Sequence, residues 1–158
     1  MDIKEIIEEA LKKIFSLIGI KPEYTVEKTD EDAYSVAVFG DNLNFLIGFR
    51  GQSLDALQTL IKLIVFRKTE KQIVLSIDIN GYRNARVEKL QEMARGYIDK
   101  VRFFEKEMEL PTMNPWERRQ IHVFVSEYDD VTSESTGEGE GRRVVLKPKK
   151  VASKKKVK

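Results

Sequence analysis

The most informative pattern in this sequence is LIGFRGQSLDALQ, from Leu46 to Gln58. Two glycines, Gly48 and Gly51, separate a short apolar piece from a helical pattern that begins at Leu54. Glycine lets a backbone approach a ligand closely, and the N–H groups at the start of the following helix favour a phosphate. The pattern predicts a loop that grips a nucleic-acid backbone, although an ordinary joint between two helices can use the same glycines.

The elements on either side of this stretch are predicted from periodicity and turn signals. Apolar residues recur at helical spacing from Ile3 to Ile18, and Gly19 follows. Alternating residues on either side of a polar turn at 29–32 predict a hairpin, and 71–79 reads as one more strand. The order is therefore helix, strand, strand, short helix, helix, strand.

In this order of elements the stretch resembles the signature of KH domains in their type II arrangement. The resemblance implies a domain over residues 1–80 in which Gly48, Phe49, Arg50 and Gly51 hold the backbone of about four unpaired nucleotides. It also implies an apolar groove for the bases, lined by Ile47, Leu54 and the strand residues near Val74. The first residue between the glycines is usually Lys in that family. Here it is Phe49, so half of the usual loop charge is missing and stacking is expected to help.

The second half of the chain is predicted to begin with one long helix, Tyr82 to Phe104, that bridges two domains. Asn114-Pro115-Trp116-Glu117 combines an N-cap, a proline at the first helical position and a glutamate at the third, so a helix should run to about Ser126. A short strand is expected at 107–110 and a second hairpin at 131–136 and 142–146. The apolar seam of the long helix is read as Val87, Leu90, Ala94, Tyr97, Val101 and Phe104.

Arg118 and His122 stand four residues apart, so they share one face of the predicted helix. With residues 113–117 before them, and Ser-Glu-Ser and 142–145 after them, they resemble the Arg-x-x-x-His (R-three-H) domains, which bind single-stranded nucleic acid. The resemblance implies a small α/β domain over 81–147, in which Arg118 forks to phosphate and His122 offers a donor or a stacking surface. Further phosphate contacts are expected from Arg119, Arg142 and Arg143.

The residues alone leave a plainer alternative open for this pair. Arg118 could pair with Glu117 or Glu127 across the surface, and His122 could be a half-buried, hydrogen-bonded side chain. The carboxylate groups at 105–109 and at 127–130 have no base, nucleophile or ligand set beside them, so they are read as solvated surface.

Composition excludes several function classes. The chain has no Cys and one His, which excludes a disulfide scaffold, a Cys nucleophile and a Cys-ligated zinc site. Phosphate-loop, dinucleotide and hydrolase motifs are absent, so we predict no enzyme and no cofactor. The N-terminus is acidic and no apolar run approaches about 18 residues, which predicts a cytoplasmic protein without membrane insertion.

Charge is distributed unevenly along the chain. Residues 1–141 hold 19 Lys and Arg against 26 Asp and Glu, whereas 142–158 hold 9 basic residues and no acid. Residues 148–158 are predicted to be a disordered, lysine-rich tail. The tail could add non-specific affinity for nucleic acid or could simply keep the protein soluble.

A KH domain followed by an R-three-H domain resembles one bacterial family, the Jag or KhpB proteins, also described as SpoIIIJ-associated or EloR proteins. Many members begin with a Jag domain that is expected to be missing here. The resemblance implies an α+β protein that binds single-stranded RNA at two sites, with single-stranded DNA as an alternative ligand. The long helix is expected to fix the distance between the two sites. It also implies a role in post-transcriptional regulation and cell elongation or division, and pairing with a small single-KH protein or a second copy. The alternative is an adaptor for cell-envelope or membrane-insertion factors.

Overall fold

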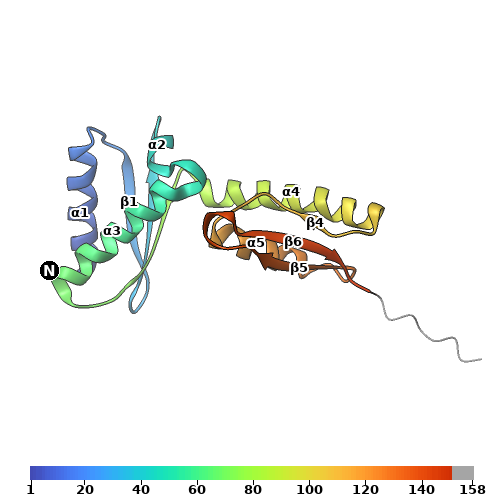
Figure 1. The fold of residues 1–158 in the computed structure, drawn as a ribbon. Coiled ribbons are helices and arrows are strands. Elements are labelled where there is room, and N and C mark those ends of the chain that lie inside the picture. Colours follow the sequence, from blue (N-terminus) through green and yellow to red (C-terminus); the bar gives the residue numbers. More distant parts are fainter. Residues whose placement is uncertain (151–158) are drawn as a thin grey trace, which may run out of the picture. The chain divides into compact units, whose positions relative to one another are not determined.

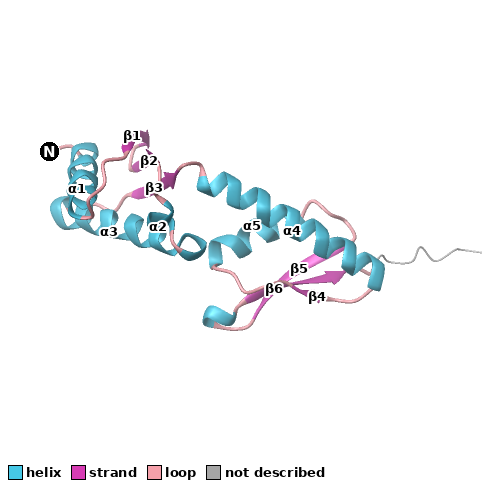
Figure 2. Cartoon of the chain, turned by 90° about the horizontal axis from the view of Figure 1, so that it is seen from above, coloured by secondary structure: helices cyan, strands magenta, loops and turns pink. Residues whose placement is uncertain are grey.

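The computed structural model describes residues 1–150 and divides the chain into two compact units, residues 1–83 and the part from residue 84 onward. Each unit has its own three-stranded sheet and its own hydrophobic core. Figure 2 shows helices and strands in both. The α+β class predicted from the sequence is confirmed. None of the helices in residues 1–150 is long and apolar enough to cross a membrane.

The first unit follows the predicted order of elements. It contains α1 (Ile3–Leu17), β1 (Glu23–Asp30), β2 (Ala33–Phe39), α2 (Asn44–Ile47), the 3-10 turn η1 (Phe49–Gly51), α3 (Gln52–Thr69) and β3 (Val74–Ile79). The strands lie in the order β1-β2-β3, with β1 and β2 antiparallel and β2 and β3 parallel. In Figure 1, α1 and α3 run beside the sheet. Their apolar faces build the core with alternate strand residues, among them Ile7, Leu11, Ile61, Val65, Val36, Val38 and Ile77.

Parallel pairing places the glycine loop at one end of this sheet. Val38 is opposite Ile79, so β2 and β3 finish at the same end of the sheet. Asn80, just after β3, ties the two chain exits together, because its side chain accepts from the N–H of Gly40 at 3.1 Å and donates to the Gly40 carbonyl at 2.8 Å. The segment that follows β2 and the segment that follows β3 are thus held side by side.

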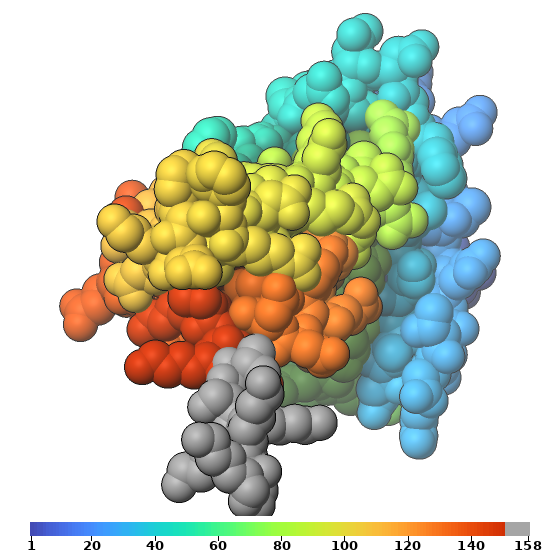
Figure 3. All heavy atoms as spheres, turned by 90° about the vertical axis from the view of Figure 1, so that its right-hand side faces the viewer, coloured from blue at the N-terminus to red at the C-terminus, as the bar shows by residue number. Residues whose placement is uncertain are grey.

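The second unit contains α4 (Tyr82–Phe104) from Asn84 onward, β4 (Met108–Glu109), α5 (Pro115–Val125), β5 (Val131–Thr136), the 3-10 turn η2 (Gly139–Gly141) and β6 (Arg143–Pro148). Its sheet is antiparallel, in the order β4-β6-β5. The core joins both helices to the strands. In Figure 3 the yellow spheres of the C-terminal part of α4 lie directly against the orange and red spheres of the later segments.

Two details of the predicted second half are wrong. Phe104 is 55% exposed and outside the core, whereas Ile98, left out of the predicted seam, is 1% exposed. A straight helix repeats every 3.6 residues, so over four turns its buried stripe moves away from a strict heptad seam. Pro148 is the last residue of β6 and faces Val131, so the predicted tail does not begin at 148. The rest of that predicted tail, residues 151–158, lies outside the described residues.

Candidate functional site

The loop of the first unit depends on two glycines with positive φ angles. Gly48 ends α2 at φ +70° and ψ −171°, and Gly51 precedes α3 at φ +80°. A Cβ atom on Gly48 would lie 2.2 Å from Ser53 Oγ, and one on Gly51 would lie 3.2 Å from the ring of Tyr82. Position 48 therefore requires glycine for space as well as for backbone conformation, and position 51 requires it chiefly for backbone conformation.

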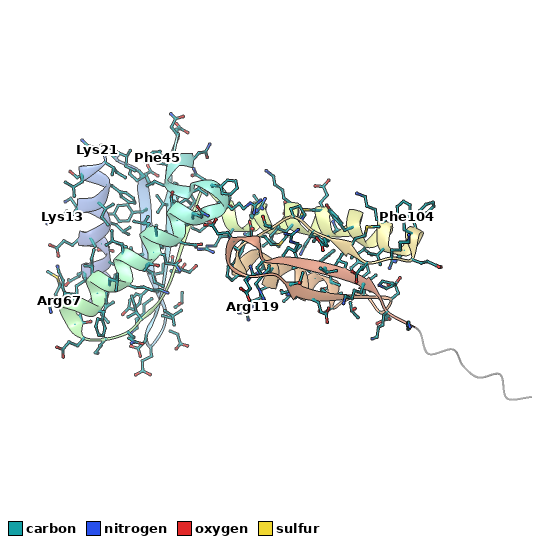
Figure 4. The ribbon with its side chains drawn as sticks, viewed as in Figure 1. Lys13, Lys21, Phe45, Arg67, Phe104 and Arg119 are labelled. Atoms are coloured by element: carbon teal, nitrogen blue, oxygen red, sulfur yellow. The ribbon has the colours of Figure 1, made fainter. Side chains whose placement is uncertain are left out.

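Phe49, which is exposed, and Arg50, which is half-buried, form the tip of this loop. Arg50 adopts the left-handed conformation at φ +51°, which non-glycine residues seldom take. Its guanidinium carbon lies 4.8 Å from the centre of the Phe49 ring, which is a cation–π contact. Phe49 is 68% exposed, and Phe45 on α2, labelled in Figure 4, is 54% exposed. The loop thus combines one cation with exposed aromatic surface.

The structure corrects the predicted groove lining. Ile47 and Leu54 are 9% and 1% exposed and belong to the core, so they support the loop from below instead of lining an open groove. Val74 is 67% exposed, but it begins β3, whereas Gly51 contacts Tyr82 just after the other end of that strand. Five residues of strand place Val74 about 16 Å from that end.

Side chains that sequence reasoning missed occupy the outer edge of β3. Gln58 Oε1 accepts from the N–H of Ile77 at 3.0 Å, and Arg83 Nε donates to the Ile77 carbonyl at 3.2 Å. Arg83 Nη2 also lies 3.5 Å from Asp55 Oδ1 on α3. No motif marks these residues, because their partners are distant in sequence. These two side chains therefore occupy the backbone N–H and carbonyl groups of Ile77 at the open edge of β3.

The start of α5 is confirmed and is anchored by a buried ion pair. Asn114 Oδ1 accepts from the N–H of Glu117 at 2.8 Å, and the Glu117 carboxylate accepts from the N–H of Asn114 at 3.3 Å. Glu117 is fully buried, and Arg86 Nε on α4 donates to it at 2.7 Å. The helix that carries Arg118 and His122 is therefore fixed to α4 at its first turn.

Arg118 and Arg142 are each held by a backbone carbonyl. Arg118 Nη1 donates to the Met113 carbonyl at 2.7 Å, and Arg142 Nη1 donates to the Gly137 carbonyl at 2.9 Å. Burial and, after it, the charges of these two guanidinium groups lower the pKa of His122. The carboxylate of Glu117, considered above as a partner of Arg118, is taken by Arg86 instead.

His122 lies between two serines of β5. Its Nδ1 is 2.7 Å from Ser133 Oγ and its Nε2 is 2.7 Å from Ser135 Oγ. Burial, followed by the charges of Arg118 and Arg142, lowers the pKa of His122, which favours the neutral ring. A neutral imidazole donates through one nitrogen and accepts through the other, so the serines take opposite roles. Ser133 and Ser135 alternate along β5 and so share one face of the strand, which could have indicated a common role, but no role was predicted for them from the sequence.

The two remaining predicted arginines are placed differently. Arg119 is exposed on α5, as Figure 4 shows. Arg143 Nη1 lies 3.1 Å from Glu109 Oε2 on β4, and its Nε donates to the Gly141 carbonyl. Arg118, His122, Arg142, Ser133 and Ser135 are hereafter called the α5–β5 cluster.

Comparison with protein families finds both predicted domains. The KhpA/KhpB KH-domain family model matches residues 4–77, and the R-three-H domain model matches residues 88–148. The matched ranges contain the glycine loop and the α5–β5 cluster respectively.

Comparison with curated proteins finds relatives along nearly the whole chain. The RNA-binding protein KhpB of Clostridium symbiosum is 34% identical over 143 residues, which cover 90% of this chain and 64% of that protein. The RNA-binding protein KhpB of Bacillus subtilis is 32% identical over 142 residues, covering 89% of this chain and 68% of that protein. The RNA-binding protein KhpB of Streptococcus pneumoniae serotype 2 is 27% identical over 150 residues, which cover 92% of this chain and 45% of that protein.

Proposed function

This chain belongs to the KhpB family of KH and R-three-H proteins, and on that premise we propose that it binds single-stranded RNA. The observation that carries the proposal is the loop from Gly48 to Gly51. Its positive φ angles end α2 and precede α3, so the N–H groups of the first turn of α3 follow Gly51, next to the partly exposed Arg50. Such a helix start attracts phosphate. The relatives named RNA-binding proteins support RNA as the ligand.

The α5–β5 cluster supports a second contact with the same ligand. Arg118 and Arg142 supply guanidinium groups, the donors best suited to phosphate oxygens. The serine that accepts from the neutral ring of His122 keeps its own O–H, which can donate to an oxygen of the ligand. Two modest sites on one chain raise the overall affinity when a single RNA reaches both. We further propose a role in post-transcriptional regulation linked to cell elongation or division, in the cytoplasm.

Fluorescence anisotropy of a labelled single-stranded RNA at two salt concentrations tests the proposal. The proteins are the full chain, a chain that ends at Lys150, and the full chain with Phe49→Asp and Arg50→Asp. We expect the shortened chain to bind and the loop variant to lose at least tenfold in affinity, because it replaces the cation with two anions. Binding that disappears with residues 151–158 alone, and does not respond to the loop variant, would contradict the proposal.

A protein partner is the second candidate, carried by an apolar ridge on α3. Leu60, Leu63 and Phe66 are 46%, 60% and 46% exposed. An exposed apolar patch is typical of an interaction surface. We propose that a second copy or a small single-KH protein binds there. Light scattering after gel filtration should show a dimer that Leu63→Lys reduces to monomer, whereas a monomer in both samples would argue against self-association.

A further inference from the structure

We propose that Phe49 is a base-stacking residue, and that the loop of the first unit binds RNA by stacking one unpaired base on this ring as well as by holding phosphate. The proposal rests on the RNA-binding function proposed above and specifies how the loop achieves it.

The first observation is that the Phe49 ring takes no part in the core. It is 68% exposed, and it is absent from the cluster of buried and partly buried apolar residues in the first unit. A large aromatic ring in water gains nothing from folding, whereas a flat π surface next to a phosphate-binding loop can cover the face of a base. Phe45, 54% exposed and four residues earlier, adds a second ring to the same short segment.

The second observation is the conformation of Arg50. Its φ of +51° is unfavourable for any residue with a Cβ atom, and such conformations gather at functional sites. In this conformation the Arg50 guanidinium carbon lies 4.8 Å from the centre of the Phe49 ring. The cation covers part of one ring face, and the ring remains two-thirds exposed. A base can therefore stack on the ring while the guanidinium stays within reach of a neighbouring phosphate.

The third observation is the charge of the first unit. Residues 1–83 carry 11 Lys and Arg against 13 Asp and Glu, and Arg50 is the one basic residue between 40 and 60. A loop with a single cation on a slightly acidic unit attracts phosphates weakly. Stacking does not depend on net charge, and it contributes a factor of roughly 5 to 150 in affinity per base. Phe49 therefore supplies binding energy that the single cation of this loop does not provide through charge.

The first test compares two probes that differ only in their bases. One is a labelled 16-nucleotide RNA of mixed sequence, and the other is an abasic sugar–phosphate oligomer of the same length. The full chain is measured with Phe49, with Phe49→Leu, which keeps apolar bulk, with Phe49→Trp, which keeps an aromatic face, and with Phe49→Lys. Phe103→Ala is the control, because Phe103 is 82% exposed and belongs to the second unit. Because Phe49 and Phe103 are both exposed, we expect all these variants to fold, and circular dichroism checks this.

Phe49→Leu should weaken binding to the RNA at least fivefold and leave binding to the abasic oligomer unchanged. Phe49→Trp should retain affinity for the RNA. Phe49→Lys should strengthen binding to the abasic oligomer and steepen the salt dependence by about 0.7 in log–log slope, the value for one additional phosphate contact on a single strand. Equal affinity of the parent chain and the Phe49→Leu variant for the RNA would overturn the stacking role while the RNA-binding function stands.

The second test locates the contact directly. RNA that carries 5-iodouridine is irradiated in complex with the full chain, and mass spectrometry identifies the cross-linked peptide. We expect a cross-link on Phe49 that disappears in Phe49→Leu. A cross-link at the α5–β5 cluster without one in the loop would overturn the inference, and an absence of binding to either probe would overturn the proposed function with it.

Discussion

The two candidate sites are built in opposite ways. In the first unit, backbone conformation makes the site: Gly48, Arg50 and Gly51 all have positive φ angles within four residues. In the second unit, side chains make it, because His122 is placed by hydrogen bonds to serines 11 and 13 residues further along the chain. A site of the first kind is sensitive to a single added carbon atom, and a site of the second kind is sensitive to the loss of a polar partner.

The largest effect is expected from Arg86→Ala in the second unit. This change leaves the fully buried carboxylate of Glu117 without its cation, which costs about 3–5 kcal/mol of unfolding free energy when a buried pair is broken. Chemical denaturation with hydrogen exchange resolved by peptide measures the effect for each unit. Arg102→Ala is the matched control, since its pair with Asp130 at 2.6 Å is nearly half exposed and should contribute much less. Equal losses in the two variants would show that burial of Glu117 does not matter.

A smaller loss is expected from Gly48→Ala in the first unit. The added Cβ must share space with Ser53 Oγ at 2.2 Å, and the backbone conformation is nearly restricted to glycine, which costs about 1–3 kcal/mol. RNA affinity should fall with stability, because α2 and α3 can no longer meet at the same angle. Gly96→Ala is the control. This position lies inside α4 with nothing within 4 Å of the new Cβ, so alanine should stabilise by up to about 1 kcal/mol. A Gly48→Ala protein as stable as the parent would show that the loop does not need glycine at position 48.

Ser135→Ala should have an effect of about 1 kcal/mol on the second unit. It leaves Nε2 of the half-buried His122 without its partner at 2.7 Å. Denaturation measures the change, and Ser76→Ala on the exposed face of β3 serves as the control with no expected effect. If Ser133→Ala and Ser135→Ala together cost no more than the control, the serines do not position the ring.

The smallest effect expected is a pH dependence confined to the second unit. His122 is the single histidine, and burial with two nearby guanidinium groups lowers its pKa. A lowered pKa means that the unfolded chain binds the proton more tightly, so stability is complete above the unfolded value near 6.5 and falls as the pH decreases below it. Denaturation between pH 7.5 and 5.5 should show this decrease in the second unit, and His122→Asn should abolish it. A decrease of the same size in the first unit would point to other groups.

Much of the fold could be predicted because its signals are local. The bounds of α4 at Tyr82 and Phe104 and those of β5 at Val131 and Thr136 are those expected from periodicity. The capping residues Asn114 and Glu117 act across three positions, so the start of α5 could be predicted from residues that are nearly adjacent.

The site was predictable only where it is equally local. The glycine loop could be predicted, since Gly48 and Gly51 need no distant partner to take positive φ angles. The burial of Ile47 and Leu54, the pairing of Arg86 with Glu117, and the two serines around His122 are seen only in the folded protein. Capping and periodicity act over a few residues, whereas burial and the choice of a polar partner depend on segments that meet only when the chain has folded.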